Sequence, residues 1–283
     1  MNRQSENAFP GPAAVPEAGL ESPLDAATDL RRRETIAMVR QALDGLQELL
    51  RGPGGFDPQA ARFDFRISAS DYFGSMLMPA LVRRLAAQAP GVRLQLVDLV
   101  PDNYVEPLDR HAVDLALIPQ GDYPAWVDSA PLFRAEFVTI ARAGHPALAG
   151  IERDCCLPLD LFCALDHVLC SPEGRFSGMG DAALARLGRS RRVAVSVPFF
   201  EAVMSIVAGS DMIALVPQDL AQPHMARGEI TCHPLPFPMT PPELCMIWHR
   251  RLTRDPAHRW MRAQVAEILR TDQPPARAAG QRP

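Results

Sequence analysis

The sequence contains no lysine. All 29 basic residues are arginine, 33 residues are acidic, and the formal net charge is −4 at pH 7. Phosphate binding needs clustered positive charge, so this acidic balance argues against a large nucleic-acid footprint in these residues. We attribute the missing lysine to codon usage in a GC-rich genome rather than to chemistry.

The chain also lacks the patterns of membrane, exported and metal-binding proteins. No apolar run approaches a membrane-spanning length. A signal peptide would need an apolar run near the N-terminus, and acidic residues interrupt that region. None of the 6 cysteines forms a C-x-x-C pair, and no histidine has zinc-finger spacing. We expect a cytoplasmic chain with reduced cysteines, no metal, no cofactor and no membrane partner. A redox-sensing pair among Cys155, Cys156 and Cys163 is the alternative.

Signatures of common enzymes are missing as well. The sequence has no G-x-S-x-G, no G-x-G-x-x-G, and no serine, histidine and aspartate at a hydrolase spacing. We therefore expect no enzyme. A pocket that joined His145 or His167 to a carboxylate and a cysteine would indicate one.

What the sequence does contain is a repeated alternation of strand and helix patterns, with 47% hydrophobic residues to form a core. The predicted strands are residues 63–67, 92–97, 113–118, 137–140, 167–170, 193–197, 212–216 and 244–248. The predicted helices are residues 72–88, 104–110, 177–187, 199–208 and 256–270. This order predicts two α/β lobes, the first from about 62–135 and 248–270 and the second from about 136–247.

The region before the body has a different composition. Residues 1–30 are rich in Pro, Ala, Gly and Glu and are predicted to be a disordered tail, as are residues 271–283. Residues 31–51 are predicted to form a linker helix whose apolar positions recur three and four apart, as in paired helices. These dimerisation residues are Ile36, Val39, Leu43, Leu46 and Leu50. Docking of this helix on its own domain is the alternative.

Six short stretches, in chain order, carry a resemblance to a known family. They are residues 65–72 (FRISASDY), 113–117 (VDLAL), 144–146 (GHP), 167–172 (HVLCSP), 197–200 (VPFF) and 213–217 (IALVP). Through them residues 62–270 resemble the effector-binding domain of LysR-type transcriptional regulators. The resemblance is closest to the branch with nodulation and aromatic-catabolism regulators.

The resemblance implies an α/β fold of two Rossmann-like lobes, of the periplasmic-binding-protein type 2 architecture, with an N-terminal linker helix. It also implies a small-molecule effector, a homodimer or tetramer paired through the linker helix, and DNA as a partner of full-length members. The family carries a winged helix-turn-helix head before its linker, and residues 1–30 have the wrong composition for one. We expect the head to be missing, through a gene fragment, a misplaced start codon or a genuine head-less regulator.

Ligands of open α/β sheets bind beyond the carboxyl ends of strands, where helix N-termini offer free N–H groups to an anion. Three junctions fit this description: Ser70-Asp71, residues 171–177 and Pro198-Phe199. The resemblance places all three around the effector pocket. The predicted effector-binding residues are Ser70, Tyr72, Phe73, Ile118, Pro119, Ser171, Ser177 and Phe199.

The resemblance also gives these residues roles. Ser70 and Ser177 would hydrogen-bond a polar head, a carboxylate, while the aromatic side chains would wall the apolar part of the ligand. The serines could equally be plain helix caps, and the aromatic rings plain core. Asp71 does not suit an anion site, so we expect it to stabilise its own helix dipole and point aside.

The sequence thus predicts a LysR-type transcriptional regulator that binds a small effector, an aromatic compound or an organic acid. Effector binding would shift a two-state oligomer. A solute-binding protein of the same two-lobed fold is the alternative, and it would need export.

Overall fold

In the computed structural model, the described residues are 56–99, 103–152 and 154–271. They belong to one unit of the chain, Gly55–Pro283. The predicted tail at 1–30 and the predicted linker helix at 31–51 lie outside the described residues, as does the tail beyond residue 271.

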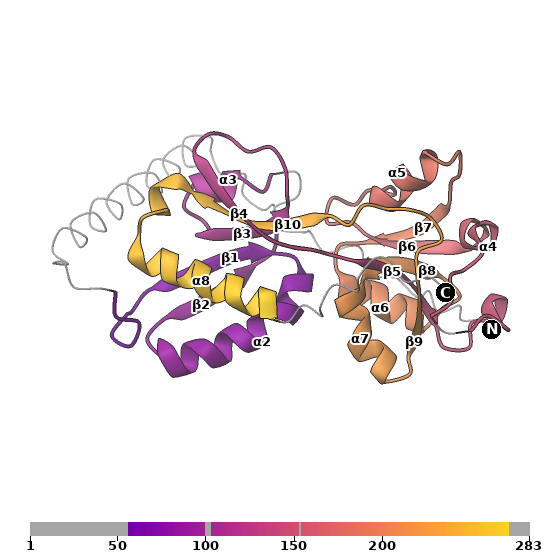
Figure 1. The fold of residues 1–283 in the computed structure, drawn as a ribbon, viewed down its shortest axis with the longest axis horizontal. Coiled ribbons are helices and arrows are strands. Elements are labelled where there is room, and N and C mark those ends of the chain that lie inside the picture. Colours follow the sequence, from indigo (N-terminus) through magenta and orange to yellow (C-terminus); the bar gives the residue numbers. More distant parts are fainter. Residues whose placement is uncertain (1–55, 100–102, 153, 272–283) are drawn as a thin grey trace, which may run out of the picture. The chain divides into compact units, whose positions relative to one another are not determined.

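Five strands form the first sheet, in the order β2-β1-β3-β10-β4 (Figure 1). Their bounds are β1 (Asp64–Ala69), β2 (Arg93–Val97), β3 (Leu115–Pro119), β4 (Val127–Arg134) and β10 (Glu243–His249). β1 is parallel to β2 and β3, whereas β10 is antiparallel to β3 and β4. Helices α2 (Asp71–Gln88) and α8 (Pro256–Thr271) cover one face, and α3 (Glu106–Asp109) covers the other.

Alternate side chains of β3 show why both faces are covered. Leu115 and Leu117 pack into the core beneath α2 and α8, while Ala116 and Ile118 pack beneath α3. All four are buried. A strand that is apolar on both faces requires helices on both, as the sequence pattern predicts.

The second sheet also has five strands, in the order β7-β6-β8-β5-β9. Their bounds are β5 (Phe137–Arg142), β6 (Asp166–Cys170), β7 (Arg192–Val197), β8 (Ile213–Pro217) and β9 (Ile230–His233). β6 is parallel to β7 and β8, and β5 is antiparallel to β8 and β9. Helices α6 (Phe200–Ala208) and α7 (Gln218–Ala226) lie on one face, and α4 (Leu159–Ala164) and α5 (Met179–Ala185) on the other (Figure 1).

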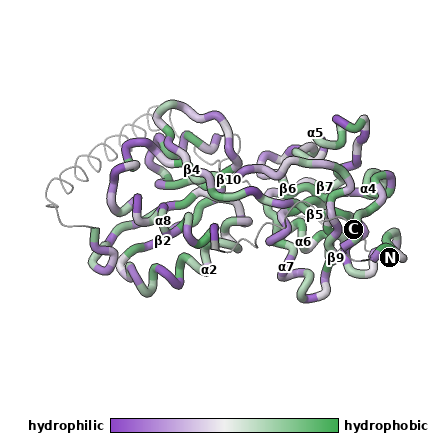
Figure 2. Tube along the Cα trace, viewed as in Figure 1, coloured by the Kyte–Doolittle hydropathy of each residue, from purple (hydrophilic) through white to green (hydrophobic). Residues whose placement is uncertain are grey.

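Figure 2 shows the hydrophobic residues concentrated along the strands of both sheets and along the helix faces that cover them. Two short 3-10 turns complete the secondary structure, η1 (Pro146–Leu148) and η2 (Arg250–Leu252). The two α/β lobes confirm the fold class predicted from the sequence.

The strand β10 corrects one predicted boundary. The sequence interpretation placed residues 244–247 in the second lobe, but β10 pairs with β3 and β4 of the first sheet. The chain therefore returns to the first lobe before Glu243, earlier than the expected position near 248. The hydrophobic pattern of a strand indicates burial and does not say into which sheet the strand inserts.

Four elements have no counterpart in the predicted set: β4, α4, α7 and β9. β4 contains Pro131 and α7 contains Pro223, and proline weakens the strand and helix patterns on which the prediction depended. Within the described residues, no helix is long and apolar enough to cross a membrane, and no group of three or more potential ligands could hold a metal ion. All six cysteines are free.

Each lobe contains one buried histidine held between a carbonyl group and an arginine. In the second lobe, Arg191 donates to His167 Nδ1 at 3.2 Å, and His167 Nε2 lies 2.8 Å from the Phe162 carbonyl. In the first lobe, Arg262 and the Asp114 carbonyl hold His258 in the same way, at 2.6 and 2.9 Å. Because arginine only donates, Nδ1 must accept and the proton sits on Nε2.

Burial lowers the pKa of both His167 and His258 to about 4, and the neighbouring arginine charges act in the same direction. In the unfolded chain these histidines titrate near 6.5. A histidine that stays neutral in the folded protein but binds a proton when unfolded favours unfolding at low pH. Its contribution to the free energy of unfolding is therefore fully present only above the pKa of the unfolded chain. This stability is lost as the pH falls from about 6.5 towards about 4.

We therefore expect the free energy of unfolding to fall between pH 7 and pH 5, at most by about 1.4 kcal/mol per pH unit for each histidine. His167→Gln and His258→Gln remove these titrations, so each variant should show a flatter profile than the wild type. Urea unfolding midpoints across this window give the measurement. Between pH 7 and 9 both histidines stay neutral in either state, so the profiles should run parallel there. Identical slopes below pH 7 would contradict this account.

Candidate functional site

The parallel strands of both sheets end beside helix N-termini. β1 ends at Ala69 and leads into α2, while β7 and β8 end at Val197 and Pro217 and lead into α6 and α7. Among the described residues, three side-chain hydrogen bonds cross between the two lobes in this region. We call this region the interlobe contact; its residues are Ser70–Tyr72, Tyr104, Cys170–Glu173, Pro198–Glu201 and Asp219.

The first of the three bonds caps a helix from the other lobe. Asp71 Oδ2 accepts a hydrogen bond from the backbone N–H of Glu201, in the first turn of α6, at 3.0 Å. The N-cap residue of α6 is Phe199, which makes no side-chain cap bond. A carboxylate at this position satisfies a free N–H group and complements the helix dipole. The expectation that Asp71 points aside is therefore wrong, because its carboxylate binds the second lobe.

The second bond comes from the neighbouring residue. The Tyr72 hydroxyl donates to Asp219 Oδ2 at 3.2 Å, so the start of α2 also contacts the start of α7. The Tyr72 ring lies 6.3 Å from the Phe200 ring in an edge arrangement. Burial and the Asp219 charge raise the pKa of Tyr72, and burial raises the pKa of Asp219 against the effect of this hydrogen bond. The phenol thus keeps its proton and remains the donor.

The third bond joins the Tyr104 hydroxyl of the first lobe to Glu173, which follows β6 in the second lobe. Ser171 also donates to Glu173, at 3.4 Å, and accepts from the Arg175 N–H at 3.0 Å. Burial raises the pKa of Glu173, but the hydrogen bond from Tyr104 and the charge of Arg175 oppose it, and the net shift is downward. Glu173 is therefore ionised at neutral pH.

A cysteine lies among these carboxylates. Burial raises the pKa of Cys170 to about 12, and the charges of Asp71 and Glu173 act in the same direction. The Cys170 thiol donates a hydrogen bond to the Pro198 carbonyl oxygen, with 3.7 Å between sulfur and oxygen. Since the thiolate is the reactive form, Cys170 is an inert polar group here.

Four of the eight predicted effector residues lie at the interlobe contact. Tyr72 and Ser171 make the bonds described above, and Ser70 begins α2 without using its side chain as a cap. Phe199 is 43% exposed at the start of α6. The helix-start and strand-end patterns marked these positions, and the family resemblance placed them around a pocket; their role in binding an effector stays a prediction.

The other four lie elsewhere. Phe73 and Ile118 are each 2% exposed: Phe73 packs against Phe133 in the core beneath α2, and Ile118 faces α3. Tyr72 is equally buried but contacts Asp219 and Phe200 of the second lobe. The hydrogen bonds and ring contacts of the described residues give Phe73 and Ile118 no such contact, so we leave them out of the candidate site. Pro119 and Ser177 are exposed, and Ser177 is not the cap of α5, which begins at Met179. Side-chain direction at a strand end or in a first helical turn depends on packing that the sequence does not show.

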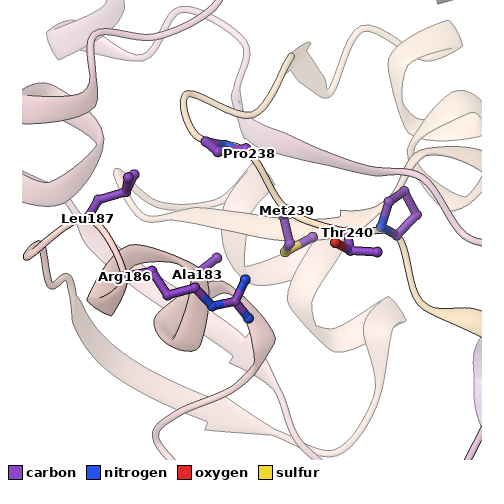
Figure 3. Close-up of a pocket in the computed structure, with 7 residues that line it drawn as sticks. Ala183, Arg186, Leu187, Pro238, Met239 and Thr240 are labelled. Atoms are coloured by element: carbon purple, nitrogen blue, oxygen red, sulfur yellow. The ribbon is translucent and has the colours of Figure 1, made fainter.

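Two surface hollows are on the second lobe, away from the interlobe contact. The larger, of about 460 Å³, lies between α5 and the segment 238–241 (Figure 3). It is lined by Ala183, Arg186, Leu187, Pro238, Met239, Thr240 and Pro241. The smaller, of about 280 Å³, lies beside η1 and includes His145 and His233. None of the predicted effector residues lines either hollow.

Sequence reasoning missed Tyr104, Glu173 and Asp219 at the interlobe contact. Asp219 had a detectable signal, because it comes two residues after Pro217 at the end of a predicted strand, a position typical of a helix start. Tyr104 was placed at the start of the predicted helix 104–110 but precedes α3, and Glu173 lies within the predicted junction 171–177. The sequence does not show that the two residues meet, because this depends on how the lobes pack.

Comparison with known proteins matches this chain to one family. Residues 59–270 match the LysR substrate binding domain. The HTH-type transcriptional activator NagR of Ralstonia sp is 30% identical over 231 residues, which cover 82% of this chain and 75% of NagR. Nodulation protein D 1 of Rhizobium tropici is 29% identical, over 82% of this chain and 74% of its own length. The relatives that match are transcriptional regulators rather than enzymes.

Solved structures give the same answer. A probable transcriptional regulator, PA0477 of Pseudomonas aeruginosa, is 31% identical with a TM-score of 0.70, and the match covers 82% of this chain and 75% of that one. The regulatory domain of MexT, a transcriptional activator of the same organism, is 32% identical with a TM-score of 0.63, over 72% of this chain and 97% of that domain. The effector binding domain of QuiR in complex with shikimate is 14% identical, with a TM-score of 0.62 over 75% of this chain and 99% of that one, and supports the fold alone.

The two-lobed, periplasmic-binding-protein-like fold predicted from the sequence is confirmed by these regulatory domains, and the family match covers most of the chain. The chain belongs to the LysR family of transcriptional regulators and carries the family's substrate binding domain at residues 59–270.

Proposed function

We propose that this LysR-family chain senses a small organic molecule, an aromatic compound or an organic acid, at the interlobe contact. The observation that carries the proposal is the set of three hydrogen bonds that cross between the lobes where the parallel strands end. This is the edge of an α/β sheet at which ligands bind. The shikimate complex of the QuiR domain supports an organic acid as one class of effector for this fold.

The proposed effector-binding residues are Ser70, Tyr72, Ser171 and Phe199, with Pro119 and Ser177 at the rim. Ser70 and Ser171 offer hydroxyl groups. Phe199 offers an exposed aromatic ring, and its neighbour Phe200 lies 6.3 Å from the buried ring of Tyr72. Aromatic side chains with a few polar groups are the usual lining of a small-molecule site.

The crossing bonds connect effector binding to the arrangement of the lobes. Asp71 and Tyr72 lie on α2, and their partners Glu201 and Asp219 lie on α6 and α7. A ligand that replaces or adds to these bonds binds one lobe arrangement better than another and shifts the balance between them. This shift is the proposed signal to the oligomer.

We further propose a homodimer or tetramer, paired through residues 31–51, that acts in the cytoplasm. These residues lie outside the described part of the chain, so the support for pairing comes from the sequence. It is the spacing of the five apolar residues from Ile36 to Leu50. DNA binding is proposed for the family's winged helix-turn-helix where one is present. The cytoplasm follows from action on transcription.

Phe199→Ala should weaken binding of an aromatic effector by roughly 2- to 10-fold, because an aromatic pair contributes about 0.5–1.5 kcal/mol. The ligand is chosen from a panel of substituted benzoates and phenols by its effect on Tm, and titration calorimetry then measures its Kd. Leu187→Ala is the matched control, since Leu187 is 46% exposed and Phe199 is 43% exposed, and Leu187 lines the hollow of Figure 3. The reverse result, with only Leu187→Ala weakening binding, would move the site to that hollow.

Tyr72→Phe should lower the free energy of unfolding by about 1–3 kcal/mol and increase the radius of gyration. The substitution removes the donor that Asp219 accepts from, and a half-buried carboxylate that loses its partner is unfavourable. Tyr123→Phe is the control, because the Tyr123 hydroxyl donates to the Pro119 carbonyl at 2.9 Å within the first lobe. X-ray scattering of both variants should show expansion for Tyr72→Phe alone. Equal radii for the two variants would argue that the Tyr72 bond does not hold the lobes together.

A further inference from the structure

Asp71 has one oxygen atom that is bonded and one that is not. Oδ2 accepts the Glu201 N–H, whereas Oδ1 is buried and has no hydrogen-bond partner among the described residues. A carboxylate oxygen accepts up to two hydrogen bonds, and leaving a buried one without any costs free energy. The Oδ1 atom is therefore suited to accept a hydrogen bond from a ligand.

The groups around Asp71 are mostly acceptors or donors already in use. The carboxylates of Glu173 and Asp219 lie at the same interlobe contact, and the hydroxyls of Tyr104 and Tyr72 donate to them. The Cys170 thiol is bonded to a carbonyl group. The interlobe contact thus combines three carboxylates with few unused donors.

Arginine charge offsets only part of this negative charge. The Arg191 side chain is 1% exposed, but both of its hydrogen bonds to a carboxylate go to Asp181 of α5. Arg175 is exposed, and its positive charge acts on Glu173. A ligand carboxylate placed here would face three like charges, and like charges at short range repel.

The position that would suit a ligand carboxylate is also occupied. The N-terminus of α6 is the kind of site that binds anions, and Asp71 supplies that anion from within the protein. An acid would have to displace Asp71 from Glu201, whereas a ligand that donates to Oδ1 leaves this bond intact.

We propose that Asp71 determines effector specificity: the effector is an aromatic compound that presents a hydrogen-bond donor, a hydroxyl or a protonated alkylamine group, to Asp71 Oδ1 rather than a carboxylate to α6. This inference rests on the proposed effector function of the interlobe contact. It narrows the effector class, and it replaces the expectation that Ser70 and Ser177 bind a carboxylate.

Three ligands of the same size test the proposal on the full chain. Benzyl alcohol carries a neutral donor, benzylamine a cationic donor, and benzoate an anion without a donor. Titration calorimetry at pH 7 should give a Kd at least tenfold lower for the alcohol or the amine than for benzoate. The first two arms distinguish a hydroxyl effector from a cationic one. This ranking tests the proposal on the wild type, whatever any variant does to folding.

Asp71→Asn gives a second, independent test. The asparagine oxygen can keep the bond to the Glu201 N–H, while its amide N–H₂ group replaces the Oδ1 acceptor with a donor. The variant should bind benzylamine and benzyl alcohol at least tenfold more weakly and benzoate more tightly than the wild type. Asp166→Asn is the matched control, because it removes the same charge from an exposed pair with Arg192. Asp166 begins β6, at the end of the strand away from Cys170 and the interlobe contact. This variant should leave all three affinities unchanged.

Two results would overturn the proposal, and they differ. If benzoate binds the wild type as tightly as the other ligands, or Asp71→Asn leaves the ranking unchanged, Asp71 does not set specificity but the interlobe site stands. If none of the three ligands binds either the wild type or Asp71→Asn, the proposed aromatic effector of the interlobe contact fails, and the specificity proposal that rests on it fails as well.

Discussion

The bond between the Asp71 carboxylate and the N–H of Glu201 is the interaction on which the arrangement of the site depends. Helix α6 begins at a phenylalanine that cannot cap it, so the first lobe satisfies this helix start. The bond places the start of α2 against the start of α6 and allows Tyr72, the next residue, to reach Asp219 on α7. Two neighbouring residues of one helix thereby hold two helices of the other lobe.

This arrangement couples the chemistry of the site to the balance between lobe positions. The bonded groups belong to different lobes, so a ligand among them competes with or adds to the contacts that hold the lobes together. The core beneath α2 and α8 and the core beneath α6 and α7 are separate layers of apolar side chains, each on its own sheet. Phe200 and Leu220 pack against both layers. A modest change at the contact can therefore move one lobe against the other without unfolding either, as a ligand-gated regulator requires.

Much of the fold was predictable because it follows from local periodicity. The strands that are buried on both faces, such as residues 115–118 and 213–216, carry continuous apolar runs that predict a buried element. The helix start at Ser70 also follows from a strand end and a residue type that favours helix starts, and the helix start at Phe199 follows from the end of a predicted strand. Phe73 and Ile118 are left out of the site because adjacent residues of a helix or strand point in different directions, and only packing shows which of them faces the other lobe. Asp71 was misjudged because its partner, a backbone N–H 130 residues away, has no signal in the sequence.

Hydrogen exchange at the Glu201 amide tests the central bond most directly. In the full chain, NMR or fragment-resolved mass spectrometry can compare the wild type with Asp71→Ala. If Asp71 caps α6 across the lobes, the Glu201 amide exchanges at least tenfold faster in the variant, while amides in the middle of α2 keep their rates. Unchanged exchange at Glu201 would show that the two lobes do not depend on this bond, and the account of the site would be contradicted.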